Sequence, residues 1–315
     1  MEELRFSVVG IGATGVVLAG ALLSHDHEVA LVDPKPNLEH ELTLNGLTIS
    51  GELSYSTPVR HFYADIGDLT NFNPNVIFIC SKTFHLNQIL DQVESIFKPG
   101  TKIISTQNGL GPEDTIAKRF GNDSVFRMSL NFGVSLRALN RADVAFFNPP
   151  NYLGGVNRGM DAFGEKIASL LTGCGLETQY VDDIKLYVWK KMILKCTMAS
   201  MCAVTGKTIK EALDFPPTRE IALECFKEIL AVAKAKGYDL GEEYVKETLA
   251  YGERVGIHKD SMGHDIENRT PTEIDFLGGR VVEYARELGI PTPYYITMTN
   301  LVRAIEDNYT GPHSR

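Results

Sequence analysis

The sequence predicts an α/β fold, in which a helix-covered parallel β-sheet is followed by an all-helical C-terminal part. Three observations predict it. Short β-branched runs alternate with helical patterns through the N-terminal half, helical patterns with short links dominate after residue 160, and the 315 residues are enough for two domains of about 150 residues each. Strands that alternate with helices favour a parallel sheet with both faces covered.

The N-terminal half contains strand-like runs separated by helical patterns. The expected strands are Arg5–Val9, Glu28–Val32, Val76–Cys80 and Lys102–Thr106, and the expected helices are Ala13–Ser24, Phe84–Phe97 and Pro112–Arg119. An insert between the second and third strands, Leu42–Arg60, has alternating apolar residues and an Asn-Gly pair. We therefore expect a hairpin or a pair of short strands in the insert.

The C-terminal half changes from strands to helices. The pattern is strand-like from Phe132 to Val156, and a last strand at Leu176–Val181 is expected to join the sheet. Helices are expected at Asp161–Thr172, Asp182–Val204, Pro217–Lys236, Gly241–Val255, Pro271–Leu288 and Pro293–Asp307. We accordingly expect one domain over residues 1–181 and a helical domain over residues 182–315.

Composition excludes several classes of protein. The chain has 31 basic and 40 acidic residues, a formal charge of −9, whereas a nucleic-acid partner requires a basic face. No run of about 18 apolar residues occurs, and the first apolar run, Phe6–Val9, lacks a basic flank, so neither a membrane span nor a signal peptide is expected. Five cysteines without CxxC or Cys/His spacing predict reduced thiols, a cytoplasmic location and no metal site.

The most informative local motif is a glycine-rich turn between a buried strand and an apolar helix. Gly10, Gly12 and Gly15 form a GxGxxG pattern. The first glycine permits a tight turn, the second leaves room for a pyrophosphate, and the third lets helix and strand pack closely. N–H groups at the helix start, where Ala13 and Thr14 lie, are suited to phosphate. The motif predicts a Rossmann-type dinucleotide-binding domain, with a plain glycine turn as the alternative.

Asp33 ends the second expected strand, 23 residues after Gly10. At this position a carboxylate accepts hydrogen bonds from the ribose hydroxyls of NAD and repels the 2′-phosphate of NADP. Asp33 therefore favours NAD(H). Lys35 offers a charge that could offset this repulsion, so NADP(H) stays open, as does a purely local role for Asp33 in the turn at Pro34.

The chain resembles the ketopantoate reductases (2-dehydropantoate 2-reductases) in an ordered set of motifs. After the glycine turn these are Ser81-Lys82, Thr106-Gln107-Asn108-Gly109, Trp189-Lys190-Lys191, Ser261-Met262-Gly263-His264-Asp265 and Thr272-Glu273-Ile274-Asp275. The resemblance runs from Arg5 to about Glu306. It implies that the N-terminal domain holds the cofactor, that the helical domain closes over it, and that the substrate lies in the cleft.

The resemblance also implies a role for each matched residue. Lys191 corresponds to the general acid that protonates the new hydroxyl group. Glu273 corresponds to the carboxylate that meets the nicotinamide ribose and orients the lysine. Asn108, near the nicotinamide, and Lys82, at the cofactor edge of the cleft, are expected to contact both cofactor and substrate. Ser261 corresponds to the serine that binds the carboxylate end of the substrate.

The helix expected at Asp182–Val204 gives an independent reason to examine its lysines. It is apolar almost all round, which predicts burial. Lys191 and Lys195 are four residues apart on one face, where like charges repel by about 0.2–0.5 kcal/mol. A bound anion would remove that cost, and partial burial beside a second cation lowers the pKa of an ammonium group. The alternative is that both lysines reach solvent.

The same helix departs from the family pattern. The family has asparagines four and eight residues after the catalytic lysine, where this chain has Lys195 and Ala199. Asparagine both donates and accepts hydrogen bonds, lysine only donates them, and the alanine side chain does neither. The sequence therefore supports a 2-keto acid reductase more strongly than it supports ketopantoate as the substrate. Lys195 is expected to bind substrate, and an extra cation suggests a more acidic substrate.

Local alternatives stay open for the other matched residues. Lys82 could be a solvated loop lysine, and Asn108-Gly109 is a common turn dipeptide. Glu273 closes a capping-box pattern that begins at Thr270 and could do no more than start a helix. The polar stretch Lys259–Arg269 is typical of a loop.

We therefore expect a cytoplasmic NAD(P)H-dependent oxidoreductase that reduces a 2-keto acid, with 2-dehydropantoate to pantoate, a step of pantothenate biosynthesis, as the first choice. The alternatives are another 2-keto or 2-hydroxy acid, an imine as in opine-type dehydrogenases, or a nucleotide sensor without turnover. No nucleic-acid, membrane or metal partner is expected. A homodimer stays open because dimers are the commonest soluble assembly.

Overall fold

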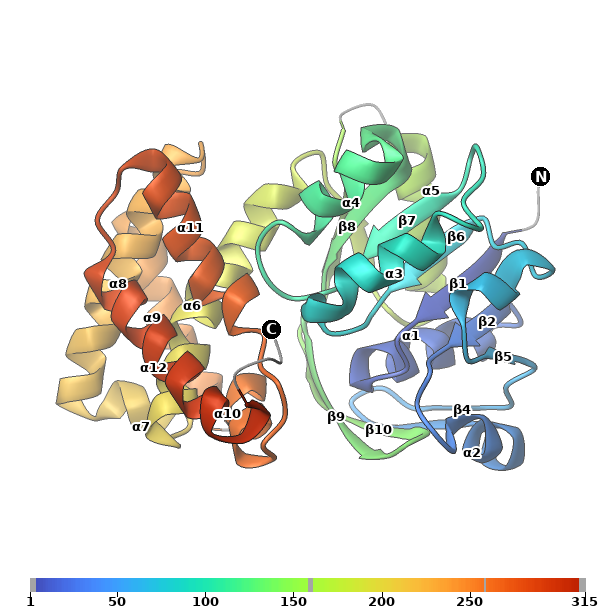
Figure 1. Cartoon of the computed structure of the whole chain (residues 1–315), viewed down its shortest axis with the longest axis horizontal. Helices are drawn as coiled ribbons and strands as arrows, with labels where there is room; N and C mark the ends of the chain where they lie inside the picture. Colours follow the sequence, from blue (N-terminus) through green and yellow to red (C-terminus); the bar gives the residue numbers. More distant parts are fainter. Residues whose placement is uncertain (1–3, 158–160, 258, 312–315) are drawn as a thin grey trace. The chain divides into compact units, whose positions relative to one another are not determined.

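The computed structural model describes residues 4–157, 161–257 and 259–311. The chain divides into two compact units, which Figure 1 shows in sequence colours. The N-terminal unit contains residues 1–107 and 111–184, and the helical unit contains residues 108–110 and 185–315. No helix in the described ranges is long and apolar enough to cross a membrane.

An eight-stranded sheet forms the centre of the N-terminal unit and confirms the α/β prediction. Its spatial order is β12-β11-β8-β7-β6-β1-β2-β5. The bounds are β1 (Arg5–Val9), β2 (Glu28–Val32), β5 (His61–Tyr63), β6 (Val76–Ile79), β7 (Lys102–Ser105), β8 (Val125–Ser129), β11 (Asn151–Gly155) and β12 (Thr178–Tyr180). Strands β11 and β12 run opposite to the other six, and the order of connection reverses between β1 and β6.

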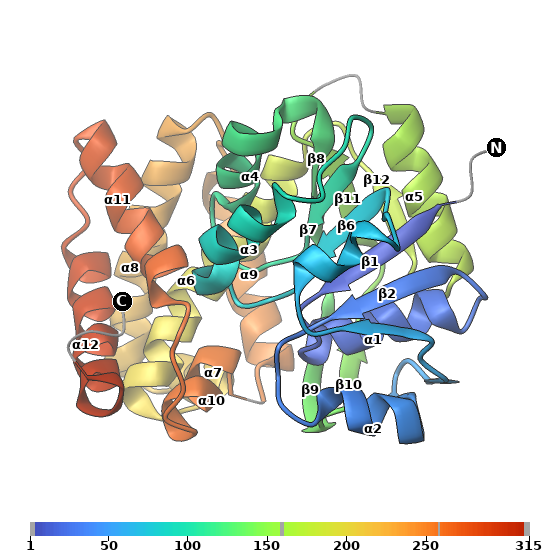
Figure 2. The same ribbon diagram turned by 45° about the vertical axis from the view of Figure 1, so that its right-hand side comes forward.

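Alternate residues of the central strands face two separate hydrophobic cores, as expected for strands buried on both faces. Val8 packs in the core beneath α1 (Ala13–Leu23) and α5 (Asp161–Gly173), whereas Val9 packs in the core beneath α3 (Leu86–Val93) and α4 (Pro112–Phe120). Figure 2 shows α3 and α4 on one side of the sheet and α5 on the other. The sheet is therefore wound on both faces.

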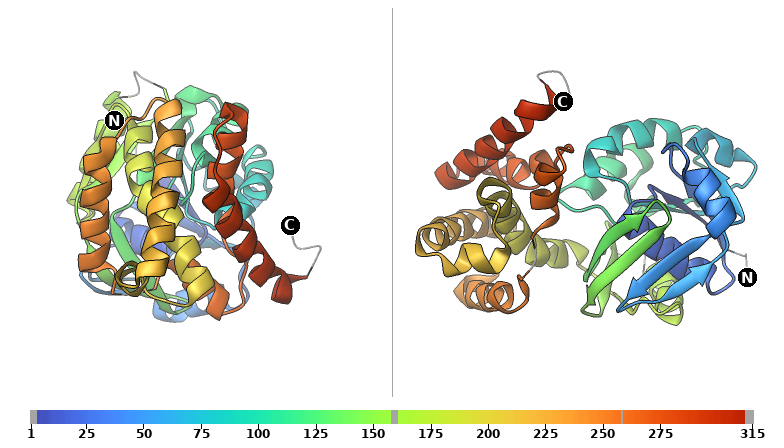
Figure 3. Two further views of the ribbon diagram at one scale, coloured as in Figure 1. Left: turned by 90° about the vertical axis from the view of Figure 1, so that its left-hand side faces the viewer. Right: turned by 90° about the horizontal axis from the view of Figure 1, so that it is seen from below.

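A second, four-stranded sheet covers the outer side of α1. Its order is β4-β3-β10-β9, with bounds β4 (Tyr55–Thr57), β3 (Leu47–Gly51), β10 (Arg141–Phe147) and β9 (Phe132–Ala138). Figure 3 (right) shows these strands from below. Because α1 packs against both sheets, Gly15–Leu22 are buried without interruption, and this explains why the helix is apolar on every face.

The prediction for the insert is confirmed in its second part and wrong in its first. Strands β3 and β4 pair antiparallel, as expected. The preceding Leu38–Asn45 forms helix α2 instead of a strand. The Asn45-Gly46 pair ends this helix, because Gly46 adopts a φ of 61° and its N–H donates to the Leu42 carbonyl at 2.9 Å. The same dipeptide is typical of hairpin turns and of helix ends, and the sequence does not distinguish the two.

The helical unit is built around α6 (Ile184–Thr205), which confirms the predicted burial of this helix. Trp189, Ile193 and Met198 lie in one continuous core with residues of the surrounding helices. Those helices are α7 (Ile209–Asp214), α8 (Pro216–Ala235), α9 (Gly241–Val255), α10 (Ser261–Glu267), α11 (Gly278–Leu288) and α12 (Pro293–Thr310). Figure 3 (left) shows helices of this unit, coloured yellow to red, side by side.

Two secondary-structure predictions in the helical unit are wrong. The continuous helix expected at Pro271–Leu288 is a short 3₁₀ turn, η4 (Ile274–Phe276), followed by α11. Leu277, with φ −105° and ψ −102°, separates the two. The stretch Lys259–Arg269, expected as a loop, contains α10, because Asp260 caps a seven-residue helix whose apolar face is too short to show periodicity.

The capping-box alternative for Glu273 is also wrong. No helix begins at Thr270, and the Glu273 side chain makes no cap bond to the η4 backbone. A capping box does occur in the helical unit, at the start of α7, a helix that the sequence did not predict. There the Thr208 hydroxyl accepts from the Glu211 N–H, and the Glu211 carboxylate accepts from the Thr208 N–H.

Candidate active site

The glycine-rich turn is tightly packed at Gly10 and Gly15, whereas the space beside Gly12 is open. Gly10 has a φ of 93°, and a Cβ atom on it would lie 2.5 Å from the backbone nitrogen of Ser81. A Cβ on Gly15 would lie 2.0 Å from the Gly10 carbonyl oxygen. A Cβ on Gly12 would meet no atom within 4 Å. The space over Gly12 fits the close approach of a pyrophosphate, as the motif requires.

The start of α1 is suited to a negative charge. Gly12 is the N-cap residue, with no side chain to bond the first-turn N–H groups, and the first turn contains no acidic residue. The first N–H groups of a helix have no acceptor within the helix, and the helix dipole adds a partial positive charge there. Ala13 and Thr14 belong to this first turn, so the residues present fit the phosphates of a dinucleotide.

The Asp33 carboxylate ties the end of β2 to the glycine turn. One oxygen accepts from the Ile11 N–H at 2.7 Å, and the other accepts from the Lys35 N–H at 2.9 Å. A carboxylate has about four acceptor positions, so these two bonds leave capacity for ribose hydroxyls. Asp33 therefore fixes the turn, and the side chain of Lys35 is exposed.

Lys82 lies three residues after the end of β6. This strand pairs with β1, and Gly10 directly follows β1. A buried amide holds the backbone of Lys82. The Gln107 side chain is 4% exposed, and its Nε2 donates to the carbonyl oxygens of Ser81 at 3.1 Å and Lys82 at 3.4 Å. Gln107 has no role predicted from the sequence, although a polar residue just beyond a buried strand is a signal for one. Its amide links the carboxyl ends of β6 and β7, where open α/β sheets bind ligands.

A buried ion pair is connected by hydrogen bonds to the carboxyl end of β7. Arg127 on β8 and Glu113 on α4 are 2% and 4% exposed, and Arg127 Nε lies 3.6 Å from Glu113 Oε2. Arg127 also donates to the Ser105 hydroxyl at 2.9 Å, and this hydroxyl lies 3.4 Å from Gln107 Oε1. The network therefore runs from α4 to the end of β7. An arginine between the apolar residues Phe126 and Met128 of a buried strand is the sequence signal that was missed.

In the helical unit, α6 carries Lys191 and Lys195, both partly buried, one turn apart. Lys195 Nζ lies 2.6 Å from Asp260 Oδ2 and donates to the Ser261 hydroxyl at 2.8 Å. The structure thus brings together Lys195 and Ser261, two residues that the sequence predicts to bind substrate. It adds Asp260, which the sequence analysis missed and whose charge matches that of Lys195. The expectation of a surplus cation at Lys195 is therefore wrong.

Glu273 is 6% exposed and lies in a segment fixed on both sides. The Thr272 hydroxyl donates to Glu306 Oε2 on α12 at 2.5 Å and accepts from the Ile274 N–H at 3.3 Å. The Glu273 carbonyl in turn accepts from the N–H of Leu277 at 3.1 Å. The backbone beside this carboxylate is thus anchored to α12 and to η4.

The segment Asn108–Leu110 packs in the helical unit against the turn that follows Glu273. The Leu110 N–H donates to the Phe276 carbonyl at 3.0 Å. Gly109 has a φ of 100°, and a Cβ on it would lie 2.6 Å from the same carbonyl oxygen. The structure therefore brings Asn108 near the Glu273 segment. The expected residues form two groups, with Gly10, Gly12, Gly15, Asp33 and Lys82 in the N-terminal unit and Asn108, Lys191, Lys195, Ser261 and Glu273 in the helical unit.

The cysteines contribute no nucleophile. All five are free thiols. Burial raises the pKa of Cys80 to about 12 and that of Cys174 to about 11, and it raises the pKa of the other three as well. A thiol with such a pKa stays protonated at neutral pH. Among the residues that the structure describes, no three His, Cys, Asp or Glu side chains form a group that could hold a metal ion.

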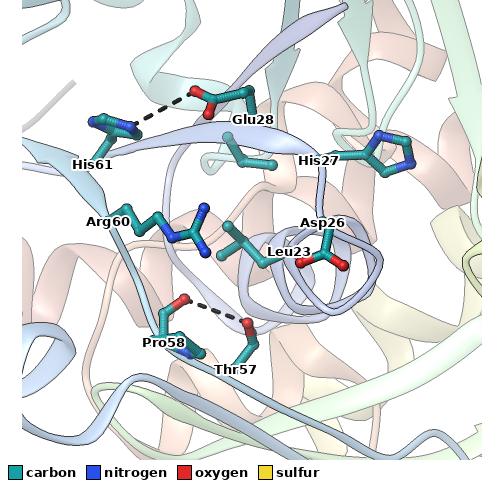
Figure 4. Close-up of a pocket in the computed structure, with 9 residues that line it drawn as sticks. Leu23, Asp26, His27, Glu28, Thr57, Pro58, Arg60 and His61 are labelled. Carbon is teal, nitrogen blue, oxygen red and sulfur yellow. Dashed lines mark hydrogen bonds and ion pairs between the residues drawn. The ribbon is translucent and has the colours of Figure 1, made fainter.

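A shallow depression on the N-terminal unit lies at the wrong end of the sheet for the cofactor (Figure 4). Glu28 and His61, the first residues of β2 and β5, line it together with His27 and Arg60. His61 Nε2 lies 3.7 Å from Glu28 Oε2. Ligands of open α/β sheets bind at the carboxyl ends of the strands, whereas this depression is at their amino ends.

Known proteins match almost the whole chain. The family model described as ketopantoate reductase PanE/ApbA matches residues 6–155, and the model of the C-terminal part of that family matches residues 183–306. A 2-dehydropantoate 2-reductase of Streptococcus pyogenes serotype M6 is 28% identical over 304 residues, which are 95% of this chain and 97% of that relative. One from Lactococcus lactis is 26% identical over 315 residues and covers 96% and 98% of the two chains.

Solved structures share the fold. A ternary structure of D-mandelate dehydrogenase with NADH and anilino(oxo)acetate has a TM-score of 0.88 at 23% identity, covering 97% of this chain and 99% of that chain. A 2-dehydropantoate 2-reductase from Geobacter metallireducens has a TM-score of 0.89 at 21% identity, covering 96% and 99%. Since the two family models together span both units, the chain belongs to the ketopantoate reductase family of NAD(P)-dependent oxidoreductases, which act on CH–OH groups.

Proposed function

We propose that this chain reduces a 2-keto acid to a 2-hydroxy acid with NADH or NADPH, and that 2-dehydropantoate, giving pantoate for pantothenate biosynthesis, is its first candidate substrate. The observation that carries the proposal is the position of Lys191, a partly buried cation on a helix that is otherwise packed in the core. An ammonium group placed there is partly shielded from solvent and can donate a proton to a bound ligand. The relatives named 2-dehydropantoate 2-reductase support the same reaction.

In the proposed reaction the nicotinamide, when bound, supplies a hydride to the keto carbon. The Lys191 ammonium group donates a proton to the keto oxygen, so the carbonyl gains one hydride and one proton and becomes a hydroxyl. The contact strengthens as negative charge develops on that oxygen. The Glu273 carboxylate orients the lysine, and Asn108 and Lys82 line the cofactor side. Ser261 and Lys195 donate to the substrate carboxylate.

A second candidate is a different 2-keto acid. Two positions on α6 favour it, because Lys195 and Ala199 replace asparagines that could both donate to and accept from a substrate hydroxyl. Ala199 is fully buried, so no side chain of its own reaches a substrate. The D-mandelate dehydrogenase with the same fold was solved with anilino(oxo)acetate, an oxamate that shares with 2-keto acids a carbonyl next to a carboxylate.

The test is the absorbance of the reduced nicotinamide with purified protein and 2-dehydropantoate, run separately with NADH and NADPH. Rapid oxidation that depends on the keto acid is expected. A panel of 2-keto acids, with and without ammonia to form imines, then identifies the preferred substrate. Cofactor binding without turnover on any member of the panel would contradict the proposal and favour a nucleotide sensor.

We further propose that Asp33 makes NAD(H) the preferred cofactor. Asp33→Asn keeps the size of the side chain and an oxygen for the Ile11 N–H but removes the charge that repels a 2′-phosphate. The ratio of kcat/KM for NADH to that for NADPH is expected to fall by about tenfold or more, the value of one charge-assisted hydrogen bond. If Asp33 only fixes the turn, kcat/KM falls equally for both cofactors and the ratio stays constant.

We also propose the oligomeric state, the cellular compartment and the domain boundaries of this protein. The dimeric ketopantoate reductase of Staphylococcus aureus, which shares the fold at a TM-score of 0.78 and 20% identity, supports a homodimer. The five free thiols support a reducing compartment such as the cytoplasm. The glycine turn in the N-terminal unit and Lys191 in the helical unit support a cofactor domain over residues 1–181 and a catalytic domain over residues 182–315.

A further inference from the structure

We infer that Gln107 is a positioning residue for the nicotinamide nucleotide, because it holds the Ser81–Lys82 segment beside the glycine-rich turn. The inference rests on the proposed function only in that the nucleotide is expected to bind at this turn. All the residues that carry it lie in the N-terminal unit. The family resemblance assigns roles to Lys82 and Asn108 but none to Gln107.

The Ser81–Lys82 segment is in direct contact with the glycine-rich turn. A Cβ atom on Gly10 would lie 2.5 Å from the Ser81 nitrogen and 2.7 Å from the Ser81 Cα. Just before the segment, the Cys80 N–H donates to the Val9 carbonyl at 2.8 Å. The segment therefore forms one wall of the turn, and its position decides how much space the turn leaves for a ligand.

The Gln107 amide faces a donor at one end and acceptors at the other. Its Oε1 lies 3.4 Å from the Ser105 hydroxyl. Its Nε2 donates to the carbonyl oxygens of Ser81 at 3.1 Å and Lys82 at 3.4 Å, and it lies 3.3 Å from the Ser81 hydroxyl. Carbonyl oxygens only accept hydrogen bonds, so only a donor fits at this end of the side chain.

Arg127 fixes the same orientation from the opposite end. A guanidinium group only donates, and Arg127 donates to the Ser105 hydroxyl at 2.9 Å. The Ser105 hydroxyl accepts this bond, so its own proton is left for Gln107 Oε1. Arg127, Ser105 and Gln107 are each at most 4% exposed, so water has little access to the chain of bonds. The donors thus run in one direction, from Arg127 to the Ser81 and Lys82 carbonyls.

The Ser81 carbonyl depends most on this amide. The Lys82 carbonyl also accepts from the His85 N–H at 3.1 Å, whereas the Ser81 carbonyl accepts no other hydrogen bond from the described part of the chain. Without the Gln107 donor the Ser81–Lys82 segment is less well fixed. The nucleotide would then have to order the segment when it binds, and this cost weakens binding.

The test is the dissociation constant, Kd, of the reduced nucleotide that the wild type binds more tightly, measured by nicotinamide fluorescence. Gln107→Met keeps nearly the length of the side chain but removes the donor. Gln107→Glu keeps the shape and the oxygen for Ser105, but it turns a second oxygen toward the two carbonyls. Both variants are expected to raise Kd by about tenfold or more, the value of one to two hydrogen bonds.

The order of the two variants separates donation from the filling of space. If donation to the carbonyls matters, Gln107→Glu raises Kd at least as much as Gln107→Met does. A near-native Kd for Gln107→Glu together with a raised Kd for Gln107→Met would overturn the inference, because only the shape would then matter. If Gln107→Met does not fold, Ser105→Ala removes the hydroxyl that orients the amide and is expected to raise Kd by about threefold or more. An unchanged Kd there would also overturn it.

Asn140 supplies a matched control, because it is a second buried amide of the N-terminal unit. It is 3% exposed, and its Nδ2 donates to the Gly46 carbonyl at 2.8 Å, beside the four-stranded sheet. Asn140→Leu removes this bond with little change of shape. It is expected to lower the urea midpoint but to leave Kd at the wild-type value. Equal changes of Kd in Asn140→Leu and Gln107→Met would show an effect of stability alone and would overturn the inference.

The same variants separate the role of Gln107 from the proposed reaction. If the wild type binds the nucleotide but reduces no 2-keto acid, and Kd responds to Gln107 and not to Asn140, the proposed reaction fails and the role of Gln107 stands. If reduction occurs but Kd does not respond to Gln107, the proposed reaction stands and the role of Gln107 fails. A wild-type protein that binds neither NADH nor NADPH would overturn both.

Discussion

Lys191→Ala is expected to lower kcat by about 10²–10⁴-fold, the range for loss of a positioned proton donor. The dissociation constant of the reduced nucleotide is expected to stay near the wild-type value, because the expected phosphate-binding residues Gly10, Gly12 and Gly15 lie in the N-terminal unit. Steady-state kinetics at saturating substrate and a nucleotide titration by fluorescence measure the two quantities.

The helix supplies a matched control for this prediction. Lys190 is the neighbouring residue of α6, with the same charge, and its Nζ lies 5.4 Å from the centre of the Tyr187 ring. Lys190→Ala is expected to keep kcat within a few-fold of wild type. Lys191→Arg keeps a charge but not a proton that can be released near neutral pH, and it is expected to remain slow. A near-native kcat for Lys191→Ala, or equal losses for both alanine variants, would assign the proton donor elsewhere.

The central strands could be predicted closely from the sequence because their signals are local. β1 and β2 begin and end at the expected residues, since each is a short β-branched run ended by glycine or by Asp-Pro. Helix α10 could not be predicted, because its seven residues are held by the Asp260 cap and by packing of Met262. The break at Leu277 likewise depends on contacts that no short window of sequence contains.

In the candidate site, too, features formed by neighbouring residues could be predicted from the sequence, and contacts between distant residues could not. The glycine turn is predictable because its chemistry lies within six residues of sequence, and its geometry follows from the absence of side chains. The pairs Lys195–Asp260 and Thr272–Glu306 are 65 and 34 residues apart in the sequence. The sequence names the donors and acceptors, but only the fold decides which ones meet. For this reason the surplus charge expected at Lys195 was wrong, although the residue itself was singled out.

Arg127→Met is expected to destabilise the N-terminal unit by about 3–5 kcal/mol, the cost of leaving a buried charge without its partner. Arg127 and Glu113 are 2% and 4% exposed, so water cannot replace the lost guanidinium. Far-UV circular dichroism in urea measures the loss. Fluorescence of Trp189, the single tryptophan, would follow the helical unit instead. The double variant Arg127→Met/Glu113→Gln removes both charges and is expected to recover most of the stability.

A second arginine of the N-terminal unit separates the effect of burial on stability from the effect of the distance between the charges. Arg137 donates to Asp143 at 2.8 Å, a shorter contact than the 3.6 Å between Arg127 and Glu113, but its side chain is 66% exposed. Arg137→Met is expected to leave the urea midpoint nearly unchanged, because solvent already screens that pair. If distance controlled the energy, Arg137→Met would be the more damaging change. If burial controls the energy, Arg127→Met is the more damaging change. The loss of Arg127 should then also weaken the hydrogen bonds through Ser105 and Gln107 to the backbone of Lys82, and amide exchange at the ends of β6 and β7 should be faster.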